Sequence, residues 1–284
     1  MKSTPSRLLS RFGLVAIVTT LAVSSVFATQ AIGSADSRAS GTKTAQSSKP
    51  KPTVVLVHGA WADSSGWAKV TGDLQSRGYQ VLAPSIPLRG LRQDSKYLAA
   101  FLRDRTTGPV VLVGHSYGGA VITNAATKDK DVKALVYVNA FVPDQGDSIL
   151  GLLDPNHLLN PADLFDFVRY PGAPKGDSDL YLKQAVFPGA IANGIPAAKA
   201  TAMAAAQRPV TFSALTAPSG APAWKSLPSF YLLGTEDHIV PPALQRSMAE
   251  HAGAEIATVA SGHLPMITDA TSVEALVVKA ARST

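Results

Sequence analysis

Short runs of apolar residues recur along the chain and are separated by segments with helical spacing. The first run, Thr53–Val57, is rich in β-branched residues and has no polar alternation, which is typical of a strand covered on both faces. Similar runs follow at 79–83, 110–113, 132–138, 230–233 and 255–259. Helical patterns occupy 66–77, 94–105, 118–128, 242–251 and 272–281. This alternation predicts an α/β fold, with a mostly parallel sheet flanked by helices on both faces.

The alternation breaks between roughly Phe141 and Pro228, where prolines interrupt any long regular element. Shorter helical pieces are predicted at 163–169, 179–185 and 197–207. The insertion follows the fourth buried strand and therefore projects from the carboxyl ends of the strands, where open α/β sheets bind ligands. We predict a helical cap over about 141–228 that covers a substrate, the alternative being a surface elaboration.

The N-terminus has the architecture of a signal peptide. A basic stretch from Lys2 to Arg11 precedes the apolar run Leu14–Phe27, which ends at Ala28. The run is short for a membrane-spanning helix and carries hydroxyl side chains. We expect residues 1–28 to be removed on export, leaving a secreted protein without a stable membrane anchor, with an uncleaved anchor as the alternative. Residues 29–52 are small and polar and predict a flexible linker before a domain over 53–284.

Charge and composition exclude several classes of partner and of catalytic group. The formal net charge of +6 includes three basic residues in the first 28, which contain no acid, and the rest of the chain has no basic cluster. Nucleic acid is therefore not an expected partner. The chain has no cysteine, so disulfides, thiolate metal sites and a cysteine nucleophile are excluded. No histidine pair or acidic cluster has metal-ligand spacing, and we expect no metal.

The strongest motif is Gly-His-Ser-Tyr-Gly-Gly at 114–119, between a predicted strand and a predicted helix. A nucleophilic serine in this context sits on a strained turn, and side chains at the flanking glycine positions would collide with neighbouring backbone. The helix that follows points its positive end towards a developing anion. Ser116 is therefore the candidate nucleophile.

A serine hydroxyl needs a base, and His263 follows the last predicted strand at the same edge of the sheet. The acid that orients it should follow the preceding strand, where Asp237 lies. Glu236, beside it, and Asp144, after an earlier strand, are the alternatives. The chain order serine, aspartate, histidine is that of α/β-hydrolases.

Backbone amides are expected to bind the oxyanion of the tetrahedral intermediate, each contributing roughly 3 to 4 kcal/mol. One is the amide of Tyr117, directly after the serine. The other is the amide of Ala60, in the loop after the first strand, with Trp61 as a less favoured donor. His58 is expected to buttress this loop, and His115 to be a packing residue.

A small-molecule pocket is expected between the sheet edge and the cap, lined by apolar groups. The candidate lining residues are Trp61, Tyr117, Phe141, Trp224 and Leu264. Ordinary core packing is the alternative for each of them, because aromatic side chains bury large areas wherever they occur.

His58-Gly59-Ala60-Trp61 with Trp67, the serine motif and the two late loops together resemble the α/β-hydrolase superfamily over about residues 53–284. Within it the chain most resembles the capped esterases related to plant methyl-ester esterases and hydroxynitrile lyases, and their bacterial counterparts. The resemblance implies an α/β-hydrolase fold, no cofactor and a small-molecule ester substrate. Hydroxynitrile lyases carry threonine and lysine where this chain has Gly59 and Leu264, which disfavours the lyase activity.

We therefore predict a carboxylesterase-type serine hydrolase that cleaves small to medium carboxylic esters, with thioesters, lactones and activated amides left open. A cofactor-free perhydrolase uses the same three residues and is the first alternative. A hydroxynitrile lyase is the second. A non-enzymatic binding module is disfavoured, because such modules usually lack a complete triad. The sequence does not predict an oligomeric state.

Overall fold

The structure is a computed structural model and describes residues 50–284. The predicted signal peptide (1–28) and most of the predicted linker (29–52) lie outside the described residues. Within residues 50–284, no helix has the length and apolar character needed to cross a membrane.

Six parallel strands form one sheet in the order β2-β1-β3-β4-β8-β9. Their bounds are β1 (Thr53–Val57), β2 (Val81–Leu82), β3 (Val110–His115), β4 (Val132–Val138), β8 (Ser229–Gly234) and β9 (Glu255–Val259). The inner strands are buried almost throughout, whereas edge strand β9 has exposed and half-buried residues and is buried only at Val259. All six strands predicted from the apolar runs are present, which confirms the α/β architecture.

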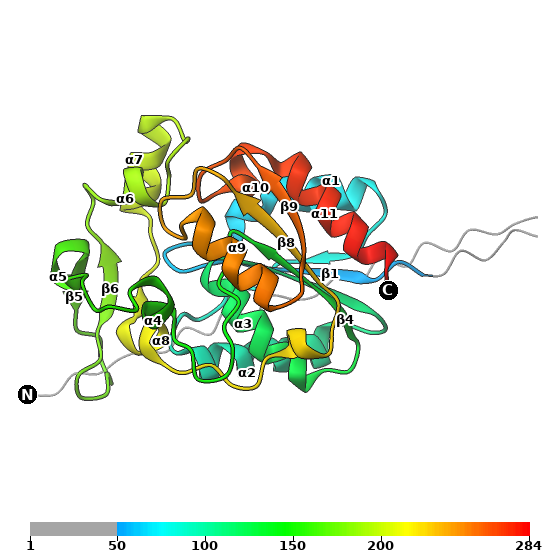
Figure 1. The fold of residues 1–284 in the computed structure, drawn as a ribbon, viewed down its shortest axis with the longest axis horizontal. Coiled ribbons are helices and arrows are strands. Elements are labelled where there is room, and N and C mark those ends of the chain that lie inside the picture. The colour runs from blue at the N-terminus through cyan, green and yellow to red at the C-terminus, as the bar shows by residue number, and fades with distance from the viewer. Residues whose placement is uncertain (1–49) are drawn as a thin grey trace, which may run out of the picture. The chain divides into compact units, whose positions relative to one another are not determined.

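Helices cover both faces of this sheet (Figure 1). α1 (Ala68–Ser76) and α11 (Ala270–Arg282) pack together on one face, and α2 (Leu91–Arg105) and α3 (Tyr117–Ala125) pack together on the other. α9 (Pro242–His251) packs against β8 and β9. The remaining short helical turns are η1 (Ser64–Trp67), η2 (Ala126–Lys128) and α10 (Pro265–Thr268). Each helix predicted outside the insertion is found, with shifts of a few residues at the ends.

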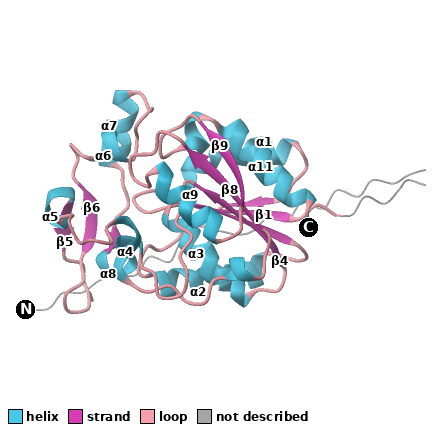
Figure 2. Cartoon of the chain, in the orientation of Figure 1, coloured by secondary structure: helices cyan, strands magenta, loops and turns pink. Residues whose placement is uncertain are grey.

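Residues 141–228, which we call the cap segment, separate β4 from β8 and contain a small sheet of their own (Figure 2). The helices here are α4 (Ile149–Leu153), α5 (Pro161–Leu164), α6 (Phe187–Ala190), α7 (Ala197–Ala205), α8 (Phe212–Thr216) and the turn η3 (Ala223–Lys225). The strands β5 (Phe165–Val168), β6 (Asp179–Leu182) and β7 (Val210–Thr211) pair antiparallel in that order. The cap segment is therefore a mixture of helices and strands.

Two of the helical pieces predicted in the cap segment are wrong. β5 replaces most of the helix expected at 163–169, and β6 replaces the one expected at 179–185. Aromatic residues in both strands favour a strand, but four residues are too few to show either period. The helix predicted at 197–207 is confirmed by α7.

Candidate active site

The turn between β3 and α3 holds Ser116 in a strained conformation. Its φ of 51° and ψ of −125° lie outside the regions that non-glycine residues commonly adopt. A Cβ at Gly114 would lie 2.6 Å from the Gly118 carbonyl oxygen, and one at Gly118 would lie 2.6 Å from the Val57 carbonyl oxygen. The glycines therefore let three backbone segments close tightly around the serine, as the motif predicts.

An aspartate and a histidine pair at the same edge of the sheet. Asp237 follows β8 and His263 follows β9, and the His263 Nδ1 lies 2.8 Å from the Asp237 Oδ2. Both side chains are almost completely buried. Because a carboxylate only accepts hydrogen bonds, Nδ1 carries a proton, and Nε2 is the ring atom left to accept one from the serine. This tautomer is the one a general base requires.

Hydrogen bonds keep the Asp237 carboxylate ionised. Oδ1 accepts from the backbone amides of Ile239 at 2.8 Å and Val240 at 3.0 Å. Burial alone would raise the pKa of Asp237, but the charge and hydrogen bond of His263 and the two amides outweigh it, so that the pKa lies below its ordinary value. The group that faces the imidazole is therefore a carboxylate.

Two amide side chains that sequence reasoning missed also donate to Asp237. Asn139 Nδ2 lies 2.9 Å from Oδ2, and Gln245 Nε2 lies 3.0 Å from the same atom. Asn139 directly follows β4 and adopts a φ of 44°, which asparagine tolerates better than most residues. Its position as a polar residue at the end of a buried strand was the available signal, whereas Gln245 on α9 gave none.

The two alternative acids lie elsewhere. Glu236 is exposed. Asp144 forms an ion pair with Lys225 at 2.8 Å and lies 3.1 Å from His251 Nε2. Of the three acids considered, the structure brings only Asp237 to His263.

The serine turn and the histidine loop touch each other through His115. His115 Nε2 lies 2.8 Å from the His263 carbonyl oxygen, and the two ring centroids are 4.6 Å apart. Burial first, and then the neighbouring His263, hold the pKa of His115 well below its usual range, so the ring is a neutral donor to that carbonyl. His115 is thus a hydrogen-bonded packing residue, as expected, and it holds the loop of His263 against the turn of Ser116.

The loop after β1 packs directly on the serine. A Cβ at Gly59 would lie 2.8 Å from the Ser116 Cβ. In the part of the chain that the structure describes, the Ala60 amide donates to no other group. The Tyr117 amide belongs to the first residue of α3 and has no partner within the helix. Two amides beside the serine are therefore available to an oxyanion.

His58 supports this loop from behind. Its Nδ1 lies 2.9 Å from the Gly59 carbonyl oxygen, and its Nε2 accepts from the Ile86 amide at 2.9 Å. Burial lowers the pKa of His58 to about 4, so the ring is neutral at neutral pH. Both ring nitrogens are used, which fits the predicted buttressing role.

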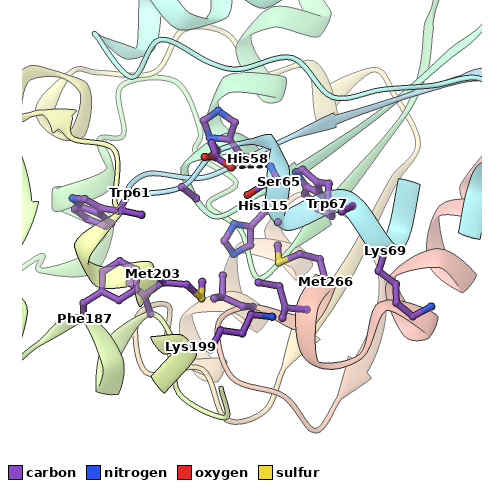
Figure 3. Close-up of a pocket in the computed structure, with 18 residues that line it drawn as sticks. His58, Trp61, Ser65, Trp67, Lys69, His115, Phe187, Lys199, Met203 and Met266 are labelled. Atoms are coloured by element: carbon purple, nitrogen blue, oxygen red, sulfur yellow. Dashed lines mark hydrogen bonds between the residues drawn. The ribbon is translucent and has the colours of Figure 1, made fainter. Parts of the chain in front are cut away.

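A cavity of about 430 Å³ lies between the loops that follow β1, β3 and β9 and the cap segment (Figure 3). Residues next to the candidate site residues line it: Trp61 follows Ala60, His115 precedes Ser116 and Leu264 follows His263. The serine itself is 4% exposed and lies just outside the lining. Most of the remaining wall is apolar and includes Trp67, Phe187, Ile191, Met203, Met266 and Ile267.

The predicted pocket residues divide into two groups. Trp61 and Leu264 line the cavity. Phe141 lies beneath the serine turn, where its amide donates to the Ser116 carbonyl oxygen at 3.1 Å. Trp224 donates to the Pro143 carbonyl oxygen at 3.1 Å and packs edge-on against the His251 ring, and it is not part of the lining.

Tyr117 is also absent from the cavity wall, because its hydroxyl turns inward and donates to the Asp94 carboxylate at 2.7 Å. The lining residues from the cap segment were missed because a proline-rich insertion gives no periodicity from which to place them. Among residues 50–284, no group of three or more histidine or carboxylate side chains could hold a metal ion.

A parallel sheet whose carboxyl edge carries a strained serine and a buried histidine–aspartate pair defines a class of α/β proteins built for nucleophilic catalysis. The family model described as "Alpha/beta hydrolase family" matches residues 54–276, and the chain belongs to this family.

Curated proteins resemble this chain over part of their length. The chain is 38% identical over 111 residues to "Carbendazim hydrolyzing esterase" of Nocardioides sp., a match that covers 35% of this chain and 46% of the relative. It is 33% identical over 111 residues to "Methylesterase 8" of Arabidopsis thaliana, covering 34% of this chain and 41% of the relative. Each match thus spans less than half of the curated relative.

The fold also matches solved structures. The crystal structure of polyneuridine aldehyde esterase superimposes with a TM-score of 0.69 at 21% identity, covering 81% of this chain and 99% of that chain. At this level of identity the likeness shows the fold, which is the predicted α/β-hydrolase fold.

Proposed function

We propose that the chain is a carboxylesterase-type serine hydrolase that cleaves small to medium carboxylic esters through an acyl-enzyme intermediate. The observation that carries the proposal is the buried His263–Asp237 pair, whose loop is joined through His115 to the strained strand-to-helix turn of Ser116. The esterase names of the relatives agree with it.

The proposed reaction begins when the Ser116 hydroxyl attacks the ester carbonyl carbon and His263 Nε2 takes its proton. Asp237 stabilises the imidazolium that forms, and the Ala60 and Tyr117 amides bind the oxyanion. Collapse of the tetrahedral intermediate breaks the bond to the alcohol oxygen, which leaves with the proton from His263. Water then attacks the acyl-enzyme with His263 again as base, and the acid is released.

The cavity supports an ester with a compact apolar group. Its volume of about 430 Å³ lies in the lower half of the range of about 300 to 1,000 Å³ that is usual for small-molecule sites. Its aromatic and thioether walls favour an aromatic or branched group. Methyl and other small-alcohol esters of such acids are the substrates we propose.

The lyase alternative stays disfavoured. Leu264, where hydroxynitrile lyases carry lysine, is a buried residue of the cavity wall. An apolar side chain at that position cannot supply a cation next to a leaving cyanide. We expect no cyanide release from a cyanohydrin.

The proposal is tested with the variant Ser116→Ala and a p-nitrophenyl ester of a short acid. We expect hydrolysis to fall by about 10⁴-fold or more, because the hydroxyl that forms the acyl-enzyme is gone, while circular dichroism and the unfolding midpoint stay close to those of the parent. Unchanged turnover would overturn the assignment. Peroxide-dependent bromination, measured in parallel, separates the hydrolase from a perhydrolase.

We also propose that residues 1–28 direct export and that the mature protein is secreted. The basic and apolar pattern of that segment supports the proposal. Intact-mass measurement of protein recovered outside the producing cell tests it, with a mature chain beginning at Thr29 as the expected result. Recovery of the whole chain in the membrane fraction would contradict it.

A further inference from the structure

One side chain of the cap segment reaches into the two loops that carry the acid and the base. Asn193 lies between α6 and α7 and is half-buried. Its Nδ2 donates to the Glu236 carbonyl oxygen at 2.7 Å, and its Oδ1 accepts from the His263 amide at 3.2 Å. A single amide group thus joins the residue before Asp237 to His263 itself.

The packing around this amide is tight. A Cβ at Gly262 would lie 2.4 Å from the Asn193 Nδ2 and 2.5 Å from the Asn193 carbonyl oxygen. Only glycine at 262 therefore allows the cap segment to approach the histidine loop this closely. The contact therefore depends on both residues, because Asn193 occupies the space that a side chain at position 262 would fill.

The peptide bond that precedes His263 is held at both ends by asparagines. Its carbonyl group, on Gly262, accepts from Asn139 Nδ2 at 2.9 Å. Its N–H group, on His263, donates to Asn193 Oδ1. Because this peptide sets the direction of the His263 side chain, one asparagine from the core and one from the cap segment fix where the imidazole points.

We propose that Asn193 is a positioning residue through which the cap segment sets the geometry of the histidine–aspartate pair. The inference rests on the proposed function and deepens it. α6 and α7 flank Asn193 and supply Phe187 and Met203 to the cavity wall. An acyl or alcohol group that fills the cavity therefore contacts the same segment that holds the His263 amide.

The test compares three variants. Asn193→Leu has a similar volume without hydrogen bonds, and Asn193→Asp keeps an acceptor for the His263 amide but loses the donor to Glu236. Asn160→Leu is the control, since Asn160 is a cap-segment asparagine whose side chain, among residues 50–284, bonds to the Ala162 amide within its own turn. kcat and KM are measured with a short p-nitrophenyl ester, together with the low-field proton resonance of the Nδ1–H that His263 donates to Asp237.

We expect Asn193→Leu to lower kcat by about 10- to 100-fold, with KM changed less than about twofold, because a misaligned base slows the chemical step more than binding. Its low-field resonance should broaden or shift upfield. Asn193→Asp should recover part of the lost kcat and of the resonance. Asn160→Leu should match the parent in both readouts.

A parent-like kcat and resonance in Asn193→Leu would overturn the inference, as would a rise in KM alone. If that variant does not fold, Asn193→Asp decides: a parent-like kcat and resonance contradict the inference, and a partial loss of both supports it. Failure of the proposed function has a different signature, because then the parent and Ser116→Ala hydrolyse the ester equally, whatever residue stands at 193.

Discussion

The carboxyl edge of the large sheet and the cap segment hold their side chains in different ways. At the sheet edge, backbone packs on backbone: a Cβ at Gly114 or Gly118 would meet main-chain atoms at 2.6 Å. The cap segment meets the core largely through side chains. Trp61 donates to the Leu180 carbonyl oxygen at 3.0 Å and stacks on Phe165, and Arg89 pairs with Asp179.

This difference suggests a division of work. A close-packed backbone has few alternative arrangements and suits groups that must stay aligned to a fraction of an ångström. Side-chain contacts tolerate substitution and suit a wall that selects the substrate. Changes at the sheet edge should therefore abolish turnover, and most changes in the cap segment should alter selectivity, with Asn193 as the exception that links the two.

The largest effect is expected at the acid. Asp237→Asn should lower kcat by about 10⁴-fold, the loss seen when the triad aspartate of a serine protease is replaced, because the amide no longer fixes the histidine tautomer. Steady-state kinetics with a short ester measure it. Asp144→Asn, at an acid paired with Lys225 away from the site, is the matched control and should behave as the parent. A larger fall in kcat for Asp144→Asn than for Asp237→Asn would mean that Asp144, and not Asp237, orients the histidine.

The second effect is on the pH dependence of the free energy of unfolding. It compares His58, a buried histidine of the core, with His157, an exposed histidine of the cap segment. Burial lowers the pKa of His58 from 6.5 to about 4. Between these two pH values the unfolded chain binds a proton that the folded chain does not, so the free energy of unfolding falls as the pH drops from 6.5 towards 4. The shift corresponds to a loss on the order of 3 kcal/mol.

Urea unfolding at a series of pH values checks this dependence. His58→Gln should flatten the slope between pH 6.5 and 4, at the cost of lower stability at neutral pH, because the support of the Gly59 carbonyl is altered. His157→Asn changes an exposed cap histidine and should leave the slope as it is. An equally steep slope in His58→Gln would show that another group takes up the proton.

The smallest effect tests the cap segment as a selective wall. Met203→Trp narrows the cavity and should lower kcat/KM for an ester with a bulky aromatic acyl group by about tenfold, close to the 1 to 3 kcal/mol that a pocket contact contributes to discrimination. Acetate ester hydrolysis should change less than about twofold. Ala202→Trp places the same side chain on the exposed side of α7, outside the lining, and should affect neither. An equal fall in kcat/KM for both esters would contradict the idea that the cap segment selects the substrate while the sheet edge carries out the reaction.

The sequence allowed the edge of the sheet to be predicted better than the cap segment. Ser116 was singled out because its turn needs glycine at fixed positions between a strand and a helix, and His263 and Asp237 because each follows a predicted strand. All of these are local signals. The strands β5 and β6 were mistaken for helices, because four-residue elements in a proline-rich segment show too few periods to tell the two patterns apart.

Long-range partners were out of reach for the same reason. Asn139, Gln245 and Asn193 are ordinary polar residues in the sequence, and their roles depend on side chains up to about a hundred positions away. Trp224 shows the converse case, since a large aromatic residue in the cap segment suggested a pocket wall and instead packs on His251 of α9.

Covalent trapping shows directly whether Ser116 is the nucleophile. The parent protein and Ser116→Ala are each treated with a fluorophosphonate, which forms a stable bond to an activated serine oxygen, and the modified residue is located by peptide mass spectrometry. We expect one adduct per parent chain, on Ser116, with ester hydrolysis lost in step with labelling, and no adduct on the variant. An adduct on another residue, or full hydrolysis by a chain already labelled at Ser116, would contradict the account.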